Sequence, residues 1–389
     1  MSSVPAGNDL VARLRRQRVV VCCGSGGVGK TTVSAALGIA LVAARPQRVM
    51  VLTVDPARRL ASALGLRQVG TEPTVVAPAL LRRAGVEPQG ELVCAMLDMK
   101  TTWDRMIERY APNREARQRI LASPFYRGIS EAFIGSHDYM AMEALYELHT
   151  SGEYDVLVID TPPSRNALDF LEAPNHLVDF VGGRLLSWLA RPSRLGWRAF
   201  NVAASPFLRM ADRLLGADML SELGTFVADV QGMYAGVQAR AQAVYDLLRS
   251  PQSGFVVVTT LEPAAFAEGE FFARTLRDYS MPLRGVVVNR ILPESLRDPA
   301  ARALAHRLID DSDSVRRWSA KLGGGLTSGA ARLAGEAHLA LEQRAERDAA
   351  QLGRLEKLAG AGAVRVPLVE RDVADLAGLA AIAGRLGGG

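Results

Sequence analysis

The sequence predicts an α/β protein with a doubly wound, mostly parallel sheet and an inserted helical subdomain. Short apolar runs rich in β-branched residues recur along the 389 residues, and longer segments with helical spacing separate them. Most runs are continuously apolar, which is typical of strands buried on both faces of a parallel sheet. Helices between such strands favour right-handed crossovers. The expected strands are residues 18–23, 48–54, 92–97, 154–160, 255–261, 284–290 and 363–366.

The spacing of these strands indicates how the chain is organised. Residues 161–254 contain no convincing strand, but in their second half apolar residues recur at steps of three and four. This spacing predicts one long amphipathic helix. The repeating residues are Leu223, Phe226, Val230, Met233, Val237, Ala241, Val244 and Leu248. We therefore expect three parts: the start of the core (1–174), a helical subdomain (175–250) and the rest of the core (251–389), with a helical block at 297–358.

Composition and charge exclude several classes of protein. The 46 basic and 41 acidic residues give a net charge of +5, and the basic residues are spread along the chain, so we expect no nucleic-acid partner. Three cysteines form no C-x-x-C pair, and the histidines show no metal-ligand spacing. No stretch is long and apolar enough to span a bilayer. We expect a cytoplasmic protein, one that could meet a membrane only peripherally, through a partner.

A glycine-rich loop follows the first expected strand and precedes a helical run. It has the G-x-x-x-x-G-K-T pattern of a phosphate-binding loop, in the strand–loop–helix context that this pattern requires. Its glycines let successive backbone N–H groups surround phosphates. We expect Lys30 to reach the β- and γ-phosphates and the Thr31 hydroxyl to ligate Mg²⁺. The candidate binding residues are Gly24, Ser25, Gly26, Gly27, Val28, Gly29, Lys30, Thr31 and Thr32.

Two aspartates end expected strands. Asp160 ends the apolar run YDVLVID, where a carboxylate holds Mg²⁺ in a Walker B arrangement. Asp55 follows the run RVMVLTV and precedes Pro56 and Ala57. Because open α/β sheets bind ligands at the carboxyl ends of their strands, we expect both aspartates beside the loop.

Five motifs in this order resemble the ArsA/Get family of ATPases, which belongs to a wider class with MinD and ParA. They are GSGGVGKTT, TVDPARRL, VIDTPPSRNALDFLEAP, VVVNR and the final RVPL, so the resemblance covers nearly the whole chain. It implies a P-loop ATPase fold, with ATP and Mg²⁺ as ligands and ATP hydrolysis as the activity. Family members work as dimers or as fused halves that open and close with nucleotide state, so a chain with one P-loop would need a second chain.

The resemblance also implies roles for individual residues. Asp55 would orient or activate the attacking water and Lys30 would stabilise the phosphates, as the catalytic residues. The segment 160–163 would be a switch that moves when the γ-phosphate is lost. Asn289 would hydrogen-bond the adenine, and the loop at Pro367 and Leu368 would pack near the base.

The loop departs from the family pattern at one position. The family normally has a lysine where this chain has Ser25, and that lysine reaches across the dimer to the partner's phosphates. A hydroxyl cannot neutralise charge as an ammonium does. We therefore favour a heterodimer with an ArsA-like paralogue over a homodimer. Two alternatives stay open: a weakly active regulatory subunit of such a heterodimer, and a MinD/ParA-like positioning ATPase.

The substrate or client is less defined than the nucleotide site. Arsenite needs convergent thiolates, but Cys22 and Cys23 are adjacent in one strand, where their side chains point to opposite faces. Arsenite is therefore not an expected ligand. In the targeting branch of the family the helical insert holds a client's transmembrane helix, so an apolar client helix or membrane protein is one expected partner. The alternative is that the insert's large apolar residues form its own core; they are Trp188, Trp197, Phe200, Phe207, Met210, Met219, Phe226 and Met233.

Overall fold

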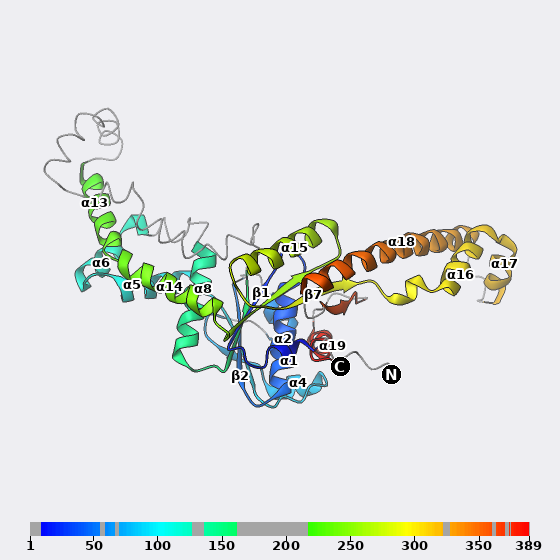
Figure 1. Cartoon of the computed structure of the whole chain (residues 1–389), viewed down its shortest axis with the longest axis horizontal. Coiled ribbons are helices and arrows are strands. Elements are labelled where there is room, and N and C mark those ends of the chain that lie inside the picture. The colour runs from blue at the N-terminus through cyan, green and yellow to red at the C-terminus, as the bar shows by residue number, and fades with distance from the viewer. Residues whose placement is uncertain are drawn as a thin grey trace.

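The protein is built on one large sheet, seen in a computed structural model that describes residues 9–54, 59–66, 70–126, 136–161, 217–321, 327–359, 363–369, 373 and 375–388. Its strands are β1 (Val19–Cys23), β2 (Arg48–Thr53), β3 (Thr74–Val75), β4 (Glu91–Met96), β5 (Val156–Asp160), β6 (Ser253–Thr259), β7 (Leu283–Ile291) and β8 (Ala363–Pro367). They lie in the order β3-β4-β2-β5-β1-β6-β7-β8 (Figure 1). All neighbouring pairs are parallel except β3 and β4. The predicted fold class is confirmed.

All seven expected strands are present, each within two residues of its expected bounds. The central strands are continuously apolar because both of their faces are covered; every residue of β1 and of β5 is buried. The sequence did not predict β3, which has two residues and pairs antiparallel at the edge of the sheet. Two residues are too few to produce a recognisable apolar run.

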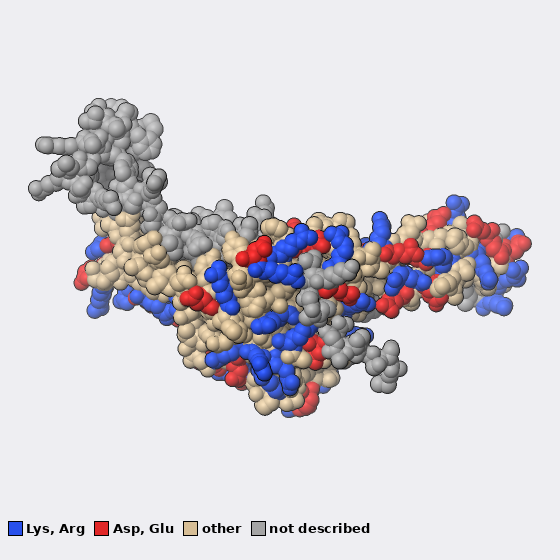
Figure 2. Space-filling model, in the orientation of Figure 1, with Lys and Arg blue, Asp and Glu red and all other residues tan. Residues whose placement is uncertain are grey.

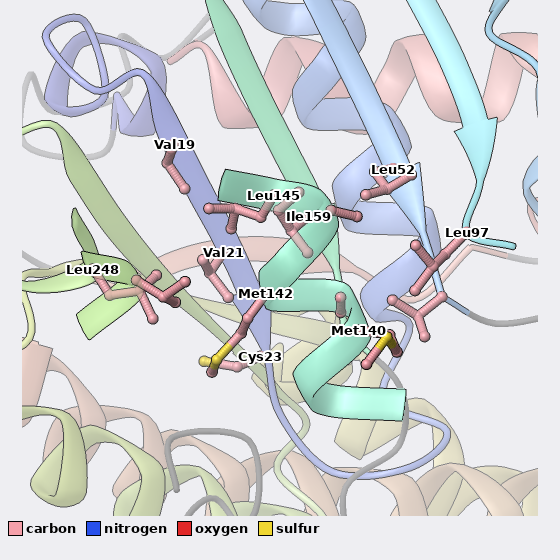
Figure 3. Packing of buried hydrophobic residues seen from close by; sticks show 14 of the residues in the cluster. Val19, Val21, Cys23, Leu52, Leu97, Met140, Met142, Leu145, Ile159 and Leu248 are labelled. Atoms are coloured by element: carbon pink, nitrogen blue, oxygen red, sulfur yellow. The ribbon is translucent and has the colours of Figure 1, made fainter. Parts of the chain in front are cut away.

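Helices cover both faces of the sheet. Val20 and Cys22 of β1 point to the face covered by α2 (Lys30–Ala44) and α19 (Leu376–Leu386). Val21 and Cys23 point to the opposite face, where Met142 of α8 (Ser136–Ser151) packs against them (Figure 3). The remaining helices near the sheet are α1 (Leu10–Arg13), α3 (Arg59–Ala63), α4 (Pro78–Arg83), α15 (Pro263–Asp278) and the short 3₁₀ helix η1 (Glu294–Arg297).

A group of helices extends from one end of the sheet (Figure 1). Besides α8, it comprises α5 (Met99–Tyr110), α6 (Arg114–Ala122), α13 (Ala217–Gln231) and α14 (Tyr234–Arg249). Asp98 and Asn113 begin α5 and α6, and each accepts a hydrogen bond from a first-turn N–H, at 3.2 and 2.8 Å. Of the predicted subdomain 175–250, the structure describes 217–250, so its outer boundary stays a prediction.

The prediction of one long helix over 223–248 is wrong, because the chain forms two helices, α13 and α14, with a break at Gly232 and Met233. A Cβ at Gly232 would lie 2.4 Å from Cγ of Pro112, so this position must pass close to the turn between α5 and α6. The apolar stripe itself is confirmed: Phe226, Met233 and Val237 are all buried in the cluster on the α8 face of the sheet. The break leaves the periodicity intact, which is why the spacing did not reveal it.

Two arginine–carboxylate pairs tie these helices together. Arg240 of α14 makes a two-armed ion pair with Glu143 of α8, and the two side chains are 10% and 3% exposed. Arg119 of α6 pairs with Asp229 of α13 at 2.7 and 2.8 Å, with the arginine half-exposed. Both members of the first pair are therefore shielded from water, whereas in the second pair only the arginine is half-exposed and Asp229 is buried.

The predicted helical block at 297–358 forms an arm that leaves the sheet on the side opposite α13 (Figure 1). Its helices are α16 (Pro299–Asp310), α17 (Ser312–Lys321) and α18 (Ser328–Ala359). Arg302 of α16 joins Glu342 and Glu346 of α18 at 2.7 Å each. Figure 2 shows Lys and Arg interspersed with Asp and Glu along this arm.

Candidate nucleotide-binding site

The loop between β1 and α2 has the backbone shape that its glycines permit. Gly24 and Gly29 have φ values of +150° and +95°, which side chains with a Cβ rarely adopt. A Cβ at Gly24 would lie 2.1 Å from the carbonyl oxygen of Val258, and one at Gly29 would lie 2.4 Å from Nδ2 of Asn289. The loop therefore passes too close to β6 and β7 for any larger residue at these two positions.

Lys30, the first residue of α2, closes this loop from inside. Its ammonium group donates to the carbonyl oxygens of Gly24 and Ser25, both at 2.9 Å. The side chain is 7% exposed. A buried ammonium at the start of a helix is well placed to attract phosphate oxygens. The backbone N–H groups of the loop and the positive end of the helix dipole attract the same oxygens.

Beside the loop, a carboxylate and two hydroxyls converge. Oδ2 of Asp160, at the end of β5, accepts hydrogen bonds from Oγ1 of Thr31 at 2.7 Å and from Oγ1 of Thr53 at 2.8 Å. Asp160 is 1% exposed. The expectation that Asp160 lies beside the loop agrees with this contact. Hard oxygen ligands of this kind are those that Mg²⁺ prefers, so the residues present fit the expected magnesium ion.

Thr53 was missed by reasoning from the sequence. It ends β2, next to β5 in the sheet, where Thr53 and Asp160 are register partners. The available signal was a polar residue at the carboxyl end of an otherwise apolar strand. Asp55 itself, with Pro56 and Ala57, lies outside the described residues, so its water-positioning role stays a prediction.

Thr161 is the last described residue of the expected switch segment. Its hydroxyl donates to the carbonyl oxygen of Cys22 at 2.9 Å, which ties the end of β5 to β1 next to the loop. Residues 162 and 163 lie outside the described residues. A movement of this segment with nucleotide state stays a prediction.

The residues predicted to contact the base lie together on the far side of the loop. Asn289 of β7 donates from Nδ2 to the carbonyl oxygen of Val28 at 2.8 Å, so its amide braces the phosphate loop. Pro367 pairs with Ile291 in the sheet, and Leu368 donates its N–H to the carbonyl of Ile291 at 2.8 Å. Leu368 is 46% exposed. Contact of these residues with adenine stays a prediction, but one edge of the sheet carries all of them.

Ser25 is directed into the protein. Its side chain is 7% exposed, and its Oγ has no hydrogen-bond partner among the residues that the structure describes. The neighbouring Gly26 and Gly27 carry no side chain that could reach outward. The described part of this loop therefore presents no cation of its own except Lys30.

The three thiols do not converge. Cys22 and Cys94 belong to the cluster on the α2 face of the sheet and Cys23 to the opposite one, as the sequence predicted for the adjacent pair. Burial raises the pKa of Cys22 and of Cys94 to about 12, and it also raises the pKa of Cys23. Neutral, separated thiols are poor ligands for a soft metalloid. The described residues hold no cluster of three or more His, Cys, Asp or Glu side chains that could bind a metal.

The parallel sheet, the loop between β1 and α2 and the Thr31–Asp160 contact define the class of P-loop nucleoside triphosphatases. Residues 17–315 match the model of one family in this class, which is described as anion-transporting ATPase. The chain belongs to this family, the ArsA ATPases. Within the described residues, no helix is both long and apolar enough to cross a membrane.

Relatives of the chain are found in fungi, bacteria and protists. A protein named ATPase GET3 from Malassezia globosa is 26% identical over 275 residues, covering 70% of this chain and 72% of that protein. Uncharacterized protein SCO2128 from Streptomyces coelicolor is 29% identical over 366 residues, covering 92% of this chain and 81% of that protein. ATPase ASNA1 homolog from Entamoeba dispar is 24% identical over 275 residues, covering 69% and 75%. The Streptomyces relative thus matches through the arm as well as the core.

Proposed function

We propose that this chain binds ATP with Mg²⁺ at the β1–α2 loop and hydrolyses it. The observation that carries the proposal is the partly buried hydrogen bond of 2.7 Å between Thr31 and Asp160, next to the loop whose carbonyls Lys30 holds. A bound Mg²⁺ would neutralise charge on the β- and γ-phosphates. Thr31 and Asp160 would hold that ion.

The chain's own residues would do the rest of the work. Lys30 would exchange its two loop carbonyls for phosphate oxygens and stabilise the charge that develops in the transition state. Backbone N–H groups of the loop would orient the triphosphate, and Asp55 would position the attacking water. Asn289 would fix the position of the loop relative to β7 through its hydrogen bond to the Val28 carbonyl.

Substitution of Lys30 and Asp160 tests this proposal. Lys30→Ala should lower single-turnover hydrolysis by about 100-fold, the usual effect of removing one transition-state donor. Asp160→Asn keeps the shape but removes the charge, and it should raise the Mg²⁺ concentration needed for half-maximal hydrolysis by about 10-fold or more. Asp348→Asn, which changes another largely buried carboxyl (9% exposed) on α18, is the control and should change neither value. Unchanged hydrolysis in both site variants would show that the activity resides elsewhere.

We further propose that nucleotide state opens and closes a complex with a second ArsA-like subunit, and that this subunit differs from the chain. Ser25 supports this proposal, because its short, buried side chain cannot reach the phosphates of another protomer. In a heterodimer, the paralogue's own lysine would act on the nucleotide bound to this chain. The chain alone should then stay monomeric with a non-hydrolysable ATP analogue and turn over slowly.

Mass photometry and single-turnover assays, with and without a paralogue from the same genome, test the heterodimer. A closed homodimer with ordinary turnover would contradict it. Ser25→Lys sharpens the test: if that lysine acts across an interface, it raises turnover at the partner's site in a mixed complex. The same buried Ser25 favours a second candidate function, a weakly hydrolysing regulatory subunit, and that role requires slow turnover even when the paralogue is present.

We propose that the complex binds an apolar client, such as a transmembrane helix of another protein. Of the large apolar residues that the sequence indicated, Phe226 and Met233 are buried in the protein's own core, at 7% and 3% exposure. The side chains of the others lie outside the described residues. A hydrophobic dye that fluoresces more in the ATP-bound complex than in the ADP-bound complex would support a nucleotide-gated apolar surface; equal fluorescence would contradict it.

A further inference from the structure

Two residues other than glycine have a left-handed backbone within the described chain, Ser280 with φ 56° and Arg290 with φ 59°. Ser280 has an ordinary structural reason. It follows the end of α15, where its N–H reaches the carbonyl of Arg277 at 2.9 Å and the next N–H, of Met281, reaches Leu276 at 2.7 Å. This is the hydrogen-bond pattern with which many helices end.

Arg290 has a different setting, a β-bulge inside a strand, and bulges of this kind are frequent beside binding sites. It belongs to β7, at the point where the pairing with β8 shifts register between Val288 and Ile291. Its left-handed backbone is held by Asn289, whose Oδ1 accepts the Arg290 N–H at 2.9 Å. Left-handed conformations are costly for residues with a Cβ, and they persist at functional sites more often than elsewhere. A glycine would be the expected residue if only the bend mattered.

The position of Arg290 connects it to the nucleotide site. On one side, the Asn289 amide holds the phosphate loop at Val28. On the other, the N–H of Leu368 binds the carbonyl of Ile291. Arg290 thus lies between the two groups that are predicted to contact the base. The phosphates are expected at Lys30, in the loop that follows β1. Since β7 is two strand spacings from β1, about 10 Å, Arg290 lies on the side of the site where the base is expected and not the phosphates.

The side chain of Arg290 is exposed and has no ion pair within the part of the chain that the structure describes. A nearby arginine shows the contrast: Arg365 of β8 joins Glu356 at 2.8 Å and Glu294 at 3.6 Å. An exposed arginine on a costly backbone, with no acidic partner among the described residues, has a guanidinium that a ligand could contact.

We propose that the Arg290 guanidinium stacks on the purine base of the bound nucleotide. This inference rests on the proposed function and adds a residue that the motifs did not indicate. A guanidinium is planar and weakly hydrated, so it stacks well on aromatic faces, which an ammonium does not. Stacking on a ring face contributes affinity for a purine ring and does not depend on the triphosphate.

The test compares Arg290→Gly with the matched control Ser280→Gly. Glycine suits the backbone at both positions, so neither variant should lower the urea midpoint of unfolding. Calorimetric titration should show ATP binding about 5- to 10-fold weaker in Arg290→Gly and unchanged in Ser280→Gly. Inorganic tripolyphosphate, which has no base, should bind wild type and both variants equally. Arg290→Lys should bind ATP as weakly as Arg290→Gly.

Three results would overturn the inference while leaving the proposed function intact: unchanged ATP affinity in Arg290→Gly, an equal loss for tripolyphosphate, or full recovery by lysine. An equal loss for tripolyphosphate, or full recovery by lysine, would indicate that Arg290 contacts the phosphates instead of the base. Failure of the wild-type protein to bind ATP would instead refute the proposed function, and this inference with it.

Discussion

Removing one partner of the buried ion pair between α14 and α8 should be among the most destabilising single substitutions in the helical group. Arg240→Met keeps most of the side-chain volume but leaves the Glu143 carboxylate, 3% exposed, without its two-armed partner. Breaking a buried pair from one side costs about 3–5 kcal/mol. Arg109, half-exposed and 3.6 Å from Glu143, offsets part of this cost. Loss of the guanidinium stacked 3.9 Å from the Tyr146 ring centroid adds to it, so we expect about 3–4 kcal/mol in total.

Urea unfolding followed by circular dichroism measures this loss. Arg119→Met, which removes the other two-armed pair, is the control and should lower the urea midpoint less, because that arginine is half-exposed and water reaches its end of the pair. The double variant Arg240→Met with Glu143→Leu should recover most of the loss, since no buried charge is left. The reasoning is refuted if Arg240→Met is as stable as Arg119→Met, or if the double variant is less stable than the single one.

Three further predictions concern the sheet and the loop. Gly24→Ala should cost about 3 kcal/mol and abolish nucleotide binding, because its Cβ would lie 2.1 Å from a carbonyl oxygen. Gly353→Ala, at an open position inside α18, is the control and should instead stabilise the protein by about 0.5–1 kcal/mol in the same urea titration. Thr53→Val should raise the Mg²⁺ requirement of hydrolysis by about 10-fold with little change in the maximal rate, since it removes a hydrogen bond that orients Asp160. Burial raises the pKa of Cys22 and Cys94 to about 12. Above about pH 9 the unfolded chain loses thiol protons that the folded protein keeps, so each thiol lowers stability by up to about 1.4 kcal/mol per pH unit. Urea midpoints at pH 8 and pH 10 should therefore differ less in Cys94→Ala than in wild type, and identical differences would contradict the assignment.

The fold was predictable from the sequence wherever burial is uniform. Strands such as β1 and β5 are covered on both faces, so every residue in them is apolar or lies at a functional end. The break between α13 and α14 was not predictable in this way. It depends on the approach of Gly232 to Pro112, more than one hundred positions earlier in the chain, and no local pattern carries that information.

The same distinction, between local patterns and long-range contacts, applies to the candidate site. The loop residues and Asp160 were predictable because their spacing and strand context are local. The contacts of Thr53 with Asp160 and of Asn289 with Val28 were not, because they depend on which strands become neighbours. The strain at Arg290 is likewise invisible in the sequence, where asparagine followed by arginine reads as an ordinary strand end. The cross-strand contacts therefore had to come from the structure.

The arm has a mechanical consequence. With 32 residues, α18 is about 48 Å long, and it precedes β8, the strand that ends beside the expected base. A tilt of about 5° at the foot of such a rod moves its far end by about 4 Å, a displacement that a pair of spin labels resolves. Changes too small to measure at the edge of the sheet would thus become measurable at Leu333 near the tip, where the side chain is 68% exposed and open to labelling.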